Sequence, residues 1–202
     1  MASVYQLKSK FQIVLRPLAN LLARWGVTAN QVTLLACFLS IVVGLCFLFG
    51  HLEPIYFLIL PVFLLMRMGL NAIDGMLARE HNMQSKVGAI LNELTDVISD
   101  SFLYYPLGLI WGVHIHLVVG FVLLAVLVEM VGVVSVQVGS SRRYDGPMGK
   151  SDRALAFSIL AILYAAGVSL HPYLSWVFIV FILLEIVTTL NRAQNALKEK
   201  KN

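Results

Sequence analysis

Residues 54–79 read PIYFLILPVFLLMRMGLNAIDGMLAR, a mostly apolar stretch that also contains Arg67, Asn71 and Asp74. A bilayer core of ~30 Å needs about 20 predominantly apolar residues in one helix. The stretch therefore predicts a membrane-spanning helix that carries polar groups inside the membrane. Working outward from it, five more apolar blocks of similar length give six predicted spans in all, at about 32–50, 54–79, 86–112, 117–139, 154–170 and 173–190.

The composition excludes a water-soluble protein. Hydrophobic residues make up 59% of the 202 residues and charged residues 13%, against roughly 45–50% and about 25% in soluble domains. The net charge of +4 does not indicate nucleic-acid binding, because the fifteen Lys and Arg residues are spread between apolar blocks and form no basic face. The predicted fold is an all-α integral membrane protein with one domain over residues 1–202.

The basic residues predict the orientation of the spans, because Lys and Arg are enriched in cytoplasmic loops. With both termini in the cytoplasm, fourteen of the fifteen fall in cytoplasmic segments and the other is Arg67. Residues 1–27 have apolar positions every three or four residues with basic and polar residues between them, which predicts an amphipathic helix at the membrane interface. Thr28 and Gln31 have the spacing of a capping box. We expect a multi-pass protein of the cell (inner) membrane.

Polar residues inside the second and third predicted spans indicate a functional site. An ionisable group in a span costs at least ~2.5–3.5 kcal/mol on insertion scales. At about 100° per residue, Arg67, Asn71 and Asp74 share one helix face. A second face carries Asn92, Glu93, Asp96 and Asp100. The connection between the two spans is short, so we expect antiparallel neighbours whose polar faces meet.

Crowded carboxylates in a medium of low dielectric repel one another unless positive charge lies between them. Asp and Asn oxygens suit Mg²⁺ or Mn²⁺, and neither polar face has a His or Cys that would favour zinc. Intramembrane carboxylates can instead relay protons or cations without chemistry. The two faces alone leave metal chemistry and ion transport open.

A motif spans both polar faces. Residues 71–79 and 88–96 resemble the pattern D-x2-D-G-x2-A-R-x8-G-x3-D-x3-D of the CDP-alcohol phosphotransferase family. Six motif positions across 26 residues match at every spacing: Asp74, Gly75, Ala78, Arg79, Gly88 and Asp96. The other two aspartates are replaced by Asn71 and Asn92, a combination that resembles a bacterial branch of the family. The six-span layout and the amphipathic amino-terminal helix are also similar to that family.

The resemblance implies an enzyme of phospholipid biosynthesis that moves a phosphatidyl-type group from CDP-diacylglycerol, or another CDP-alcohol, to a hydroxyl of a polar acceptor and releases CMP. It implies two Mg²⁺ or Mn²⁺ ions and a homodimer. By position, it implies metal ligands at Asn71, Asp74 and Asn92, and a base that deprotonates the acceptor at Asp96. It also implies nucleotide binding by Gly75, Ala78, Arg79 and, through a likeness of Thr28-Ala29-Asn30 to the family's Thr-Pro-Asn, by Thr28 and Asn30.

The two asparagines remove two of the four motif charges, and Glu93 and Asp100 on the same face could restore the count. One hypothesis shifts the roles by one turn, so that Asp96 is a ligand and Asp100 the base. A competing hypothesis keeps Asp96 as the base and makes Asp100 structural. A catalytically degenerate member of the family and an ion-coupled transporter are the alternatives to an enzyme.

The cytoplasmic loop between the fourth and fifth predicted spans contains the candidate residues for the acceptor. Lys150 and Arg153 lie three residues apart at the start of a helix, where anions bind well, and they resemble a Gly-Lys segment that holds phosphorylated acceptors in the family. Arg142 and Arg143 bind either the acceptor or anionic lipid head groups. Glu129 and Glu185, in the fourth and sixth spans, are expected to pair within the helix bundle. The sequence does not identify the acceptor alcohol.

Overall fold

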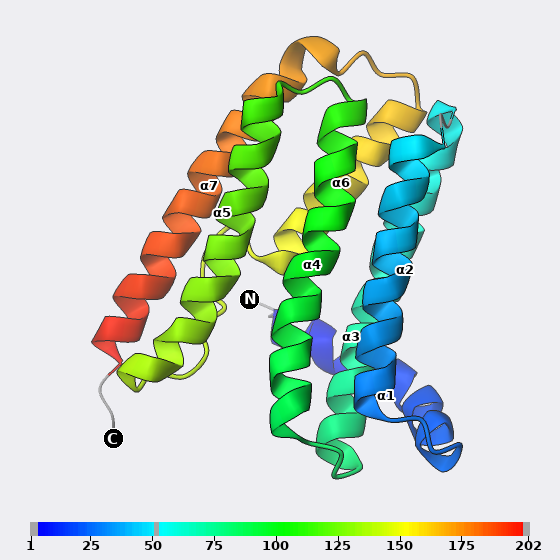
Figure 1. The fold of residues 1–202 in the computed structure, drawn as a ribbon, viewed down its shortest axis with the longest axis vertical. Helices are drawn as coiled ribbons and strands as arrows, with labels where there is room; N and C mark the ends of the chain where they lie inside the picture. The colour runs from blue at the N-terminus through cyan, green and yellow to red at the C-terminus, as the bar shows by residue number, and fades with distance from the viewer. Residues whose placement is uncertain (1–3, 51–52, 200–202) are drawn as a thin grey trace. The chain divides into compact units, whose positions relative to one another are not determined.

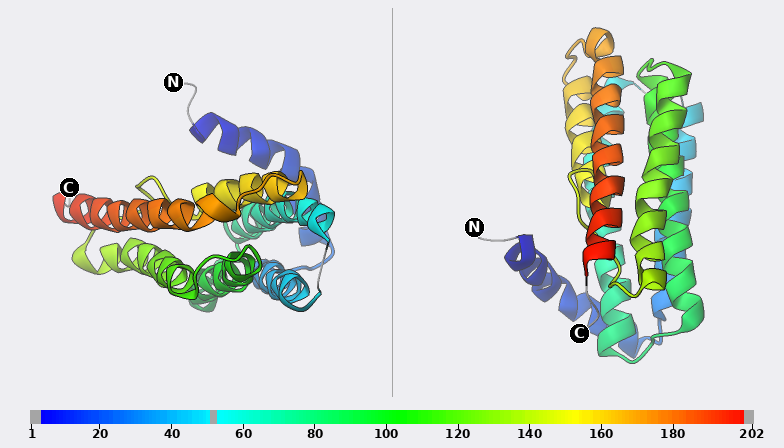
Figure 2. Two further views of the ribbon diagram at one scale, coloured as in Figure 1. Left: turned by 90° about the horizontal axis from the view of Figure 1, so that it is seen from above. Right: turned by 90° about the vertical axis from the view of Figure 1, so that its left-hand side faces the viewer.

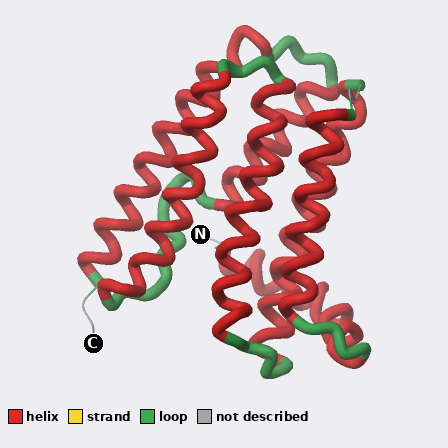
Figure 3. Tube along the Cα trace, in the orientation of Figure 1, coloured by secondary structure: helices red, strands yellow, loops and turns green. Residues whose placement is uncertain are grey.

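The computed structural model describes residues 4–50 and 53–199, and the regular elements within those ranges are all helices (Figures 1 and 3). The all-α prediction is confirmed for this part of the chain. The start of the predicted interfacial helix (1–3), residues 51–52 and the last residues of the basic tail (200–202) lie outside the described residues. The elements are α1 (Val4–Arg24), α2 (Ala29–Phe49), η1 (Pro54–Leu58), α3 (Ile59–Glu80), α4 (Lys86–Ile110), α5 (Ile115–Val134), η2 (Ser135–Val138), α6 (Lys150–Ala165) and α7 (His171–Lys198).

Within the described residues, four segments are long and apolar enough to cross a membrane, namely Ala29–Phe49, Pro54–Glu80, Ile115–Val138 and His171–Lys198. They coincide with the first, second, fourth and sixth predicted spans. The helices α4 and α6 fall on the third and fifth, but α4 is rich in charge and α6 has 16 residues, or about 24 Å at 1.5 Å per residue. The count of six spans therefore stays a prediction.

The helix α6 differs from the fifth predicted span, which was expected over 154–170. It begins earlier, at Lys150, because the Gly149 amide donates a hydrogen bond to the Asp152 carboxylate over 2.9 Å and the helix starts on this contact. It ends earlier, at Ala165, because Gly167 takes a left-handed conformation with φ of 76°. A glycine in that conformation just after a helix terminates it at little steric cost.

The structure divides into two compact units. Unit 1 contains the whole of α1, α2 up to Ile41, α3 from Phe63 and α4 up to Ser99. Unit 2 contains the remaining parts of α2, α3 and α4 together with η1, α5, η2, α6 and α7. Both units draw on the same long helices α2, α3 and α4. The prediction of a single domain over residues 1–202 stays a prediction.

In unit 1, α1 packs on α3 through one face and leaves the other uncovered by the described protein. Ala19 is buried against Ile73, Met76 and Leu77, while Val14 on the opposite face is 75% exposed. An exposed apolar face on a helix with interleaved basic residues is typical of an interfacial helix. The predicted capping box at the start of α2 is confirmed, since Thr28 and Gln31 each accept the other's backbone N–H, over 3.3 and 2.8 Å.

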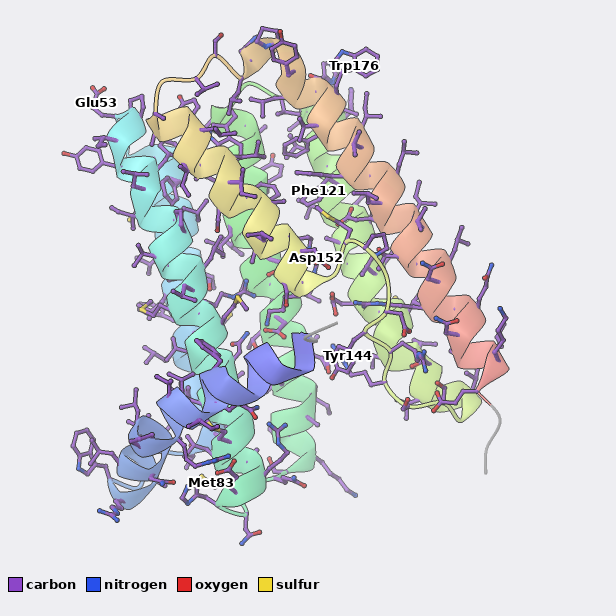
Figure 4. All side chains as sticks on the ribbon, turned by 180° about the vertical axis from the view of Figure 1, so that it is seen from behind. Glu53, Met83, Phe121, Tyr144, Asp152 and Trp176 are labelled. Carbon is purple, nitrogen blue, oxygen red and sulfur yellow. The ribbon has the colours of Figure 1, made fainter. Side chains whose placement is uncertain are left out.

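Unit 2 is built on aromatic packing. The helices α5 and α7 lie side by side (Figures 1 and 2), and their rings Phe121 (labelled in Figure 4) and Phe178 have centroids 5.4 Å apart. Phe157 of α6 contacts both rings, and its centroid is 4.3 Å from that of Tyr104 on α4. Such contacts stabilise beyond the area that they bury. The helices around this cluster position the charged residues described below.

Candidate active site

The polar faces of α3 and α4 meet in unit 1 at Asp96. The Asn71 amide donates to Asp96 Oδ1 over 3.4 Å. Arg67 Nη2 donates to the Asp96 backbone carbonyl over 3.2 Å and lies 3.8 Å from Asp96 Oδ1. Arg67 is only 3% exposed, so its charge lies in the interior beside a carboxylate. The expected meeting of the two polar faces is confirmed at these three residues.

Asp74, one turn further along α3, is also buried. The Thr33 hydroxyl of α2 donates to Asp74 Oδ2 over 2.7 Å, a short hydrogen bond of the kind that ionised acceptors form. Sequence analysis missed Thr33, and the available signal was a polar side chain in an otherwise apolar predicted span. The contact orients one oxygen of the Asp74 carboxylate.

The arginine of the motif folds back over the motif glycine. A Cβ at Gly75 would lie 3.1 Å from Arg79 Nη2 and 3.4 Å from Nη1. These contacts are tighter than most side chains make, so the absence of a Cβ lets the guanidinium approach the helix backbone. Arg79 is exposed and Ala78 is partly exposed, which leaves this turn of α3 accessible.

The start of α2 lies against the start of α4 within unit 1. A Cβ at Gly88 would lie 2.6 Å from Asn30 Oδ1 and 3.0 Å from Ser85 Oγ. A larger residue at this position would displace the side chain of Asn30, a residue far away in the sequence. The structure brings together two candidates, Asn30 and motif position Gly88, while Thr28 caps α2.

The oxygen donors of unit 1 fit a hard divalent cation. Within the described ranges, no group of three or more His, Cys, Asp or Glu side chains comes close enough to hold a metal ion, so amide oxygens have to complete a site. Asp74, Asp96, Asn71 and Asn92 offer carboxylate and amide oxygens, the ligands that Mg²⁺ and Mn²⁺ prefer, and the contact seen among them joins Asn71 to Asp96. Glu93, partly buried one residue after Asn92, adds a further carboxylate on α4.

In unit 2, Asp100 pairs with Arg153. Arg153 Nη2 lies 2.9 Å from Asp100 Oδ2 and 3.0 Å from Glu129 Oε1, and its Nη1 donates to the Met148 carbonyl over 3.2 Å. Arg153 is 0% exposed. The sequence predicted that Arg153, at the start of a helix, binds an anion of the acceptor. Its side chain instead points inward to the carboxylates of Asp100 and Glu129.

A second buried arginine, which sequence analysis did not single out, shares Glu129. Arg192 of α7 donates from Nη1 to the Val128 carbonyl over 2.6 Å and lies 3.4 Å from Glu129 Oε2. Arg142 Nη2 lies 3.5 Å from the same Glu129 oxygen. The expectation that Glu129 pairs within the bundle is confirmed, and it does so with three arginines.

Polar contacts join the loop before α6 to Glu199, the residue after α7. Tyr144 of this loop is labelled in Figure 4. Arg143 Nε donates to Asp145 Oδ2 over 2.7 Å, and Arg143 Nη1 lies 3.0 Å from Glu199 Oε2. The hydrogen bond from Arg143 holds the pKa of Asp145 below its ordinary value. The Ser140 hydroxyl and the Ser141 amide donate to Glu199 and lower its pKa as well.

Comparisons with known proteins show which proteins this chain is similar to. The family model for CDP-alcohol phosphatidyltransferases matches residues 26–189. The Escherichia coli (strain K12) inner membrane protein YnbA is 41% identical over 199 residues, which cover 96% of each chain. Phosphatidylinositol phosphate synthase of Mycobacterium marinum is 28% identical over 180 residues, which cover 84% of this chain and 70% of the relative.

The fold is shared with solved structures of phosphatidylinositol phosphate synthase from Mycobacterium tuberculosis. The structure with CDP-DAG bound has a TM-score of 0.74 at 19% identity and covers 94% of this chain and 98% of the other. The complex with manganese and citrate has a TM-score of 0.71 at 17% identity and covers 93% of both chains. Because the family model matches residues 26–189, which are most of this chain, the chain belongs to the CDP-alcohol phosphatidyltransferase family.

Proposed function

We propose that this protein transfers a phosphatidyl-type group from CDP-diacylglycerol, or a related CDP-alcohol, to a hydroxyl of a polar acceptor and releases CMP in phospholipid synthesis. The observation that carries the proposal is the contact of motif positions Asn71 and Asp96 across α3 and α4, in a chain of this family. The bound CDP-DAG in a structure of the same fold gives further support.

In the proposed reaction, the acceptor oxygen attacks the phosphorus that carries the diacylglycerol. A new P–O bond forms to the acceptor, and the bond from that phosphorus to the bridging oxygen of the diphosphate breaks. The bridging oxygen and its electron pair leave with CMP, and the hydroxyl proton of the acceptor passes to a carboxylate. A carboxylate within hydrogen-bond reach can serve as this general base.

A divalent cation, Mg²⁺ or Mn²⁺, would neutralise charge on the diphosphate of the donor. Asp74, Asn71 and Asn92 would hold it, with Glu93 as a further carboxylate, and a titration would give the number of bound ions. The manganese in a solved structure of the same fold supports the choice of metal. Gly75, Ala78 and Arg79 would contact the nucleotide and its phosphates, and Thr28 and Asn30 would fix the start of α2 beside them.

Of the two hypotheses for the base, the one with Asp96 is better supported. Asp100 Oδ2 accepts hydrogen bonds from Arg153 Nε and Nη2, over 3.3 and 2.9 Å. A carboxylate held by two guanidinium hydrogen bonds in a buried ion pair is already engaged within the protein and suits a structural anchor. We therefore assign the base to Asp96 and a structural role to Asp100.

The protein is proposed to lie in the inner membrane with six spans, both termini in the cytoplasm, and a second copy as partner. The alternating placement of basic residues supports the orientation. The name of the Escherichia coli relative, an inner membrane protein, supports the location. Acceptor binding is proposed to involve four basic residues of unit 2, namely Lys150, Arg142, Arg143 and Arg153.

The test is CMP release by the purified full chain in detergent with CDP-diacylglycerol, Mn²⁺ or Mg²⁺ and a pool of alcohols and sugar phosphates. We expect release that requires the metal and the acceptor pool and that disappears in Asp74→Ala. A matched control, Glu53→Gln, removes a carboxylate at the start of η1 and should release CMP like the unchanged protein.

The alternatives predict other outcomes. An absence of CMP release, with no metal-dependent binding of the CDP-lipid, would mean that the asparagines mark a lost active site. Ion flux in proteoliposomes without CMP release would instead identify a transporter built on the same carboxylates.

A further inference from the structure

Arg67 is a buried arginine to which the proposed reaction gives no role. It lies in an apolar stretch of α3, at none of the family's motif positions, and it is only 3% exposed. An ionisable group inside a membrane span is costly, and it indicates a functional role by default. The residues that Arg67 contacts show what this role is.

The side chain of Arg67 reaches Asp96 of α4. Its Nη2 donates to the Asp96 backbone carbonyl over 3.2 Å and lies 3.8 Å from Asp96 Oδ1. The Asn71 amide donates to the same Oδ1 over 3.4 Å. All three residues belong to unit 1, in which α3 and α4 are joined by a short connection that contains Met83 (Figure 4). One oxygen of the Asp96 carboxylate therefore faces a guanidinium and an amide.

The charges of the polar residues on α3 and α4 balance a single divalent cation. The family motif has four aspartates, whose negative charges would balance two such cations. In this chain two of the four are neutral asparagines, so the motif keeps Asp74 and Asp96. Glu93 adds one negative charge and Arg67 one positive charge. Three carboxylates and one guanidinium leave two negative charges, which one divalent cation neutralises.

A second cation beside Asp96 would meet the positive charge of Arg67. Like charges repel strongly where little water screens them, and an arginine does not lose its proton in a protein. The environment of Asp74 differs, because its Oδ2 accepts a hydrogen bond from the neutral Thr33 hydroxyl over 2.7 Å. The contacts thus favour one cation at Asp74 and disfavour a second cation at Asp96.

We propose that the site of unit 1 holds one divalent cation, and that the Arg67 guanidinium supplies beside Asp96 the positive charge that a second cation supplies in two-metal centres. The inference rests on the proposed transfer reaction and specifies the metal content of its site. Arg67 is a positioning residue in this arrangement, because it holds the backbone and the carboxylate of Asp96.

The experiment counts the Mn²⁺ ions that the purified full chain binds in detergent, from the EPR signal of unbound Mn²⁺ during a titration. Binding that persists in Asp74→Ala is subtracted as unrelated to the site. We expect about one Mn²⁺ per chain at saturation, because the guanidinium repels a second ion. A content of about two ions per chain overturns the proposal.

Two variants separate the effect of Arg67 from that of the asparagine. Asn71→Asp restores a motif carboxylate four residues after Arg67 on the same helix face, where the guanidinium compensates the new charge. We expect the Mn²⁺ content to stay at about one per chain. Arg67→Met/Asn71→Asp restores the carboxylate and removes the guanidinium, so the content should rise to about two.

The matched control removes a different arginine of unit 1. Arg16→Met/Asn71→Asp deletes an exposed guanidinium of α1 that pairs with Glu80, and its Mn²⁺ content should stay at about one per chain. Arg67→Lys keeps the positive charge, so it should retain the content of the unchanged protein. If Arg67→Met/Asn71→Asp does not fold, Arg67→Gln/Asn71→Asp, purified with Mn²⁺ present, replaces it.

The outcomes separate this inference from the proposed reaction. An unchanged Mn²⁺ content in the folded variant that lacks Arg67 overturns the assignment of the charge to Arg67, and so does a doubled content in Asn71→Asp alone. CMP release by a protein that binds two ions overturns the inference and leaves the transfer reaction intact. An absence of saturable Mn²⁺ binding overturns the inference, and if CMP release is absent as well, the transfer reaction fails with it.

Discussion

The carboxylates of the two units have different kinds of partners. In unit 1, the Asp74 and Asp96 carboxylates contact neutral groups, the Thr33 hydroxyl and the Asn71 amide, and one arginine, Arg67. In unit 2, the ion pairs have N–O distances of 2.7 to 4.0 Å. They form a network of four arginines and five carboxylates, namely Arg142, Arg143, Arg153, Arg192, Asp100, Glu129, Asp145, Glu185 and Glu199. Both clusters contain aspartates and arginine, but amide and hydroxyl partners occur in the first and paired ions make up the second.

This difference indicates which cluster performs chemistry. Carboxylate, amide and hydroxyl oxygens are the ligands that Mg²⁺ and Mn²⁺ prefer. A network of paired ions holds helices together, and removal of one member leaves the others buried without compensation. Our proposal accordingly places metal binding and proton transfer in unit 1 and gives the paired ions of unit 2 an anchoring role.

The largest expected effect separates the two aspartates of α4 that lie one turn apart. Asp96→Asn should lower the rate of CMP release by about 10²–10⁴-fold, the contribution of a general base. Asp100→Asn should keep metal affinity and lose thermal stability, because it weakens the pair with Arg153. Turnover and metal titration of both variants measure this. If Asp100→Asn instead abolishes metal binding, the roles are shifted along the helix and the comparison of units fails.

The next effect concerns the stability of the network. Arg153→Leu leaves Asp100 and Glu129 without their shared partner, and we expect a loss of about 3–5 kcal/mol, the cost of breaking a buried ion pair from one side. Arg16→Ala removes a pair with Glu80 in which both side chains are over a third exposed, and should cost far less, because water screens an exposed pair. Thermal unfolding in detergent compares the two. Similar losses in both variants would contradict the buried role of Arg153.

A smaller stabilisation should come from the metal. If Mn²⁺ binds the folded chain alone, its presence at 100 times its Kd adds about 2.7 kcal/mol to the free energy of unfolding. We expect Mn²⁺ to raise the Tm of the unchanged protein and of Glu53→Gln, and to leave the Tm of Asp74→Ala unchanged. An equal rise in Asp74→Ala would place the cation elsewhere and remove the distinction between the units.

The smallest effect is a pH dependence of the loop before α6. The pKa values of Asp145 and Glu199 are lowered in the folded protein, so their stabilising contacts are present above the ordinary carboxyl pKa of about 4. They are lost as the pH falls through the lowered values. Hydrogen exchange at the Ser141 amide, which donates to Glu199, should therefore lose protection below about pH 4, and Glu199→Gln should abolish this pH dependence. Unchanged protection across that range would contradict the loop contacts.

Local features of the sequence predicted much of unit 1. The capping box at Thr28 follows from two residues three apart, and the meeting of Asn71 with Asp96 follows from helical periodicity and a short connection. The contact of Thr33 with Asp74 could not be predicted in the same way, because it joins residues 41 positions apart, and spacing along one helix does not specify which neighbour packs there.

The network of unit 2 shows the limit of such reasoning. Arg153 and Asp100 are 53 residues apart, and Arg192 and Glu129 are 63 apart. The start of α6 near basic residues predicted an anion site, but which carboxylates turn toward an arginine depends on the packing of several helices. The sequence predicted that Glu129 pairs within the helix bundle, but it did not identify the three arginines that are its partners.

The contacts of Glu199 have a practical consequence for anyone who expresses this protein. A truncation after Lys198, the last residue of α7, would delete a carboxylate that accepts hydrogen bonds from Ser140, Ser141 and Arg143. A defect of such a shortened chain would then originate in the loop before α6 and be mistaken for a requirement for the tail. Affinity tags and deletions at this end need Glu199 retained before any loss of turnover is interpreted.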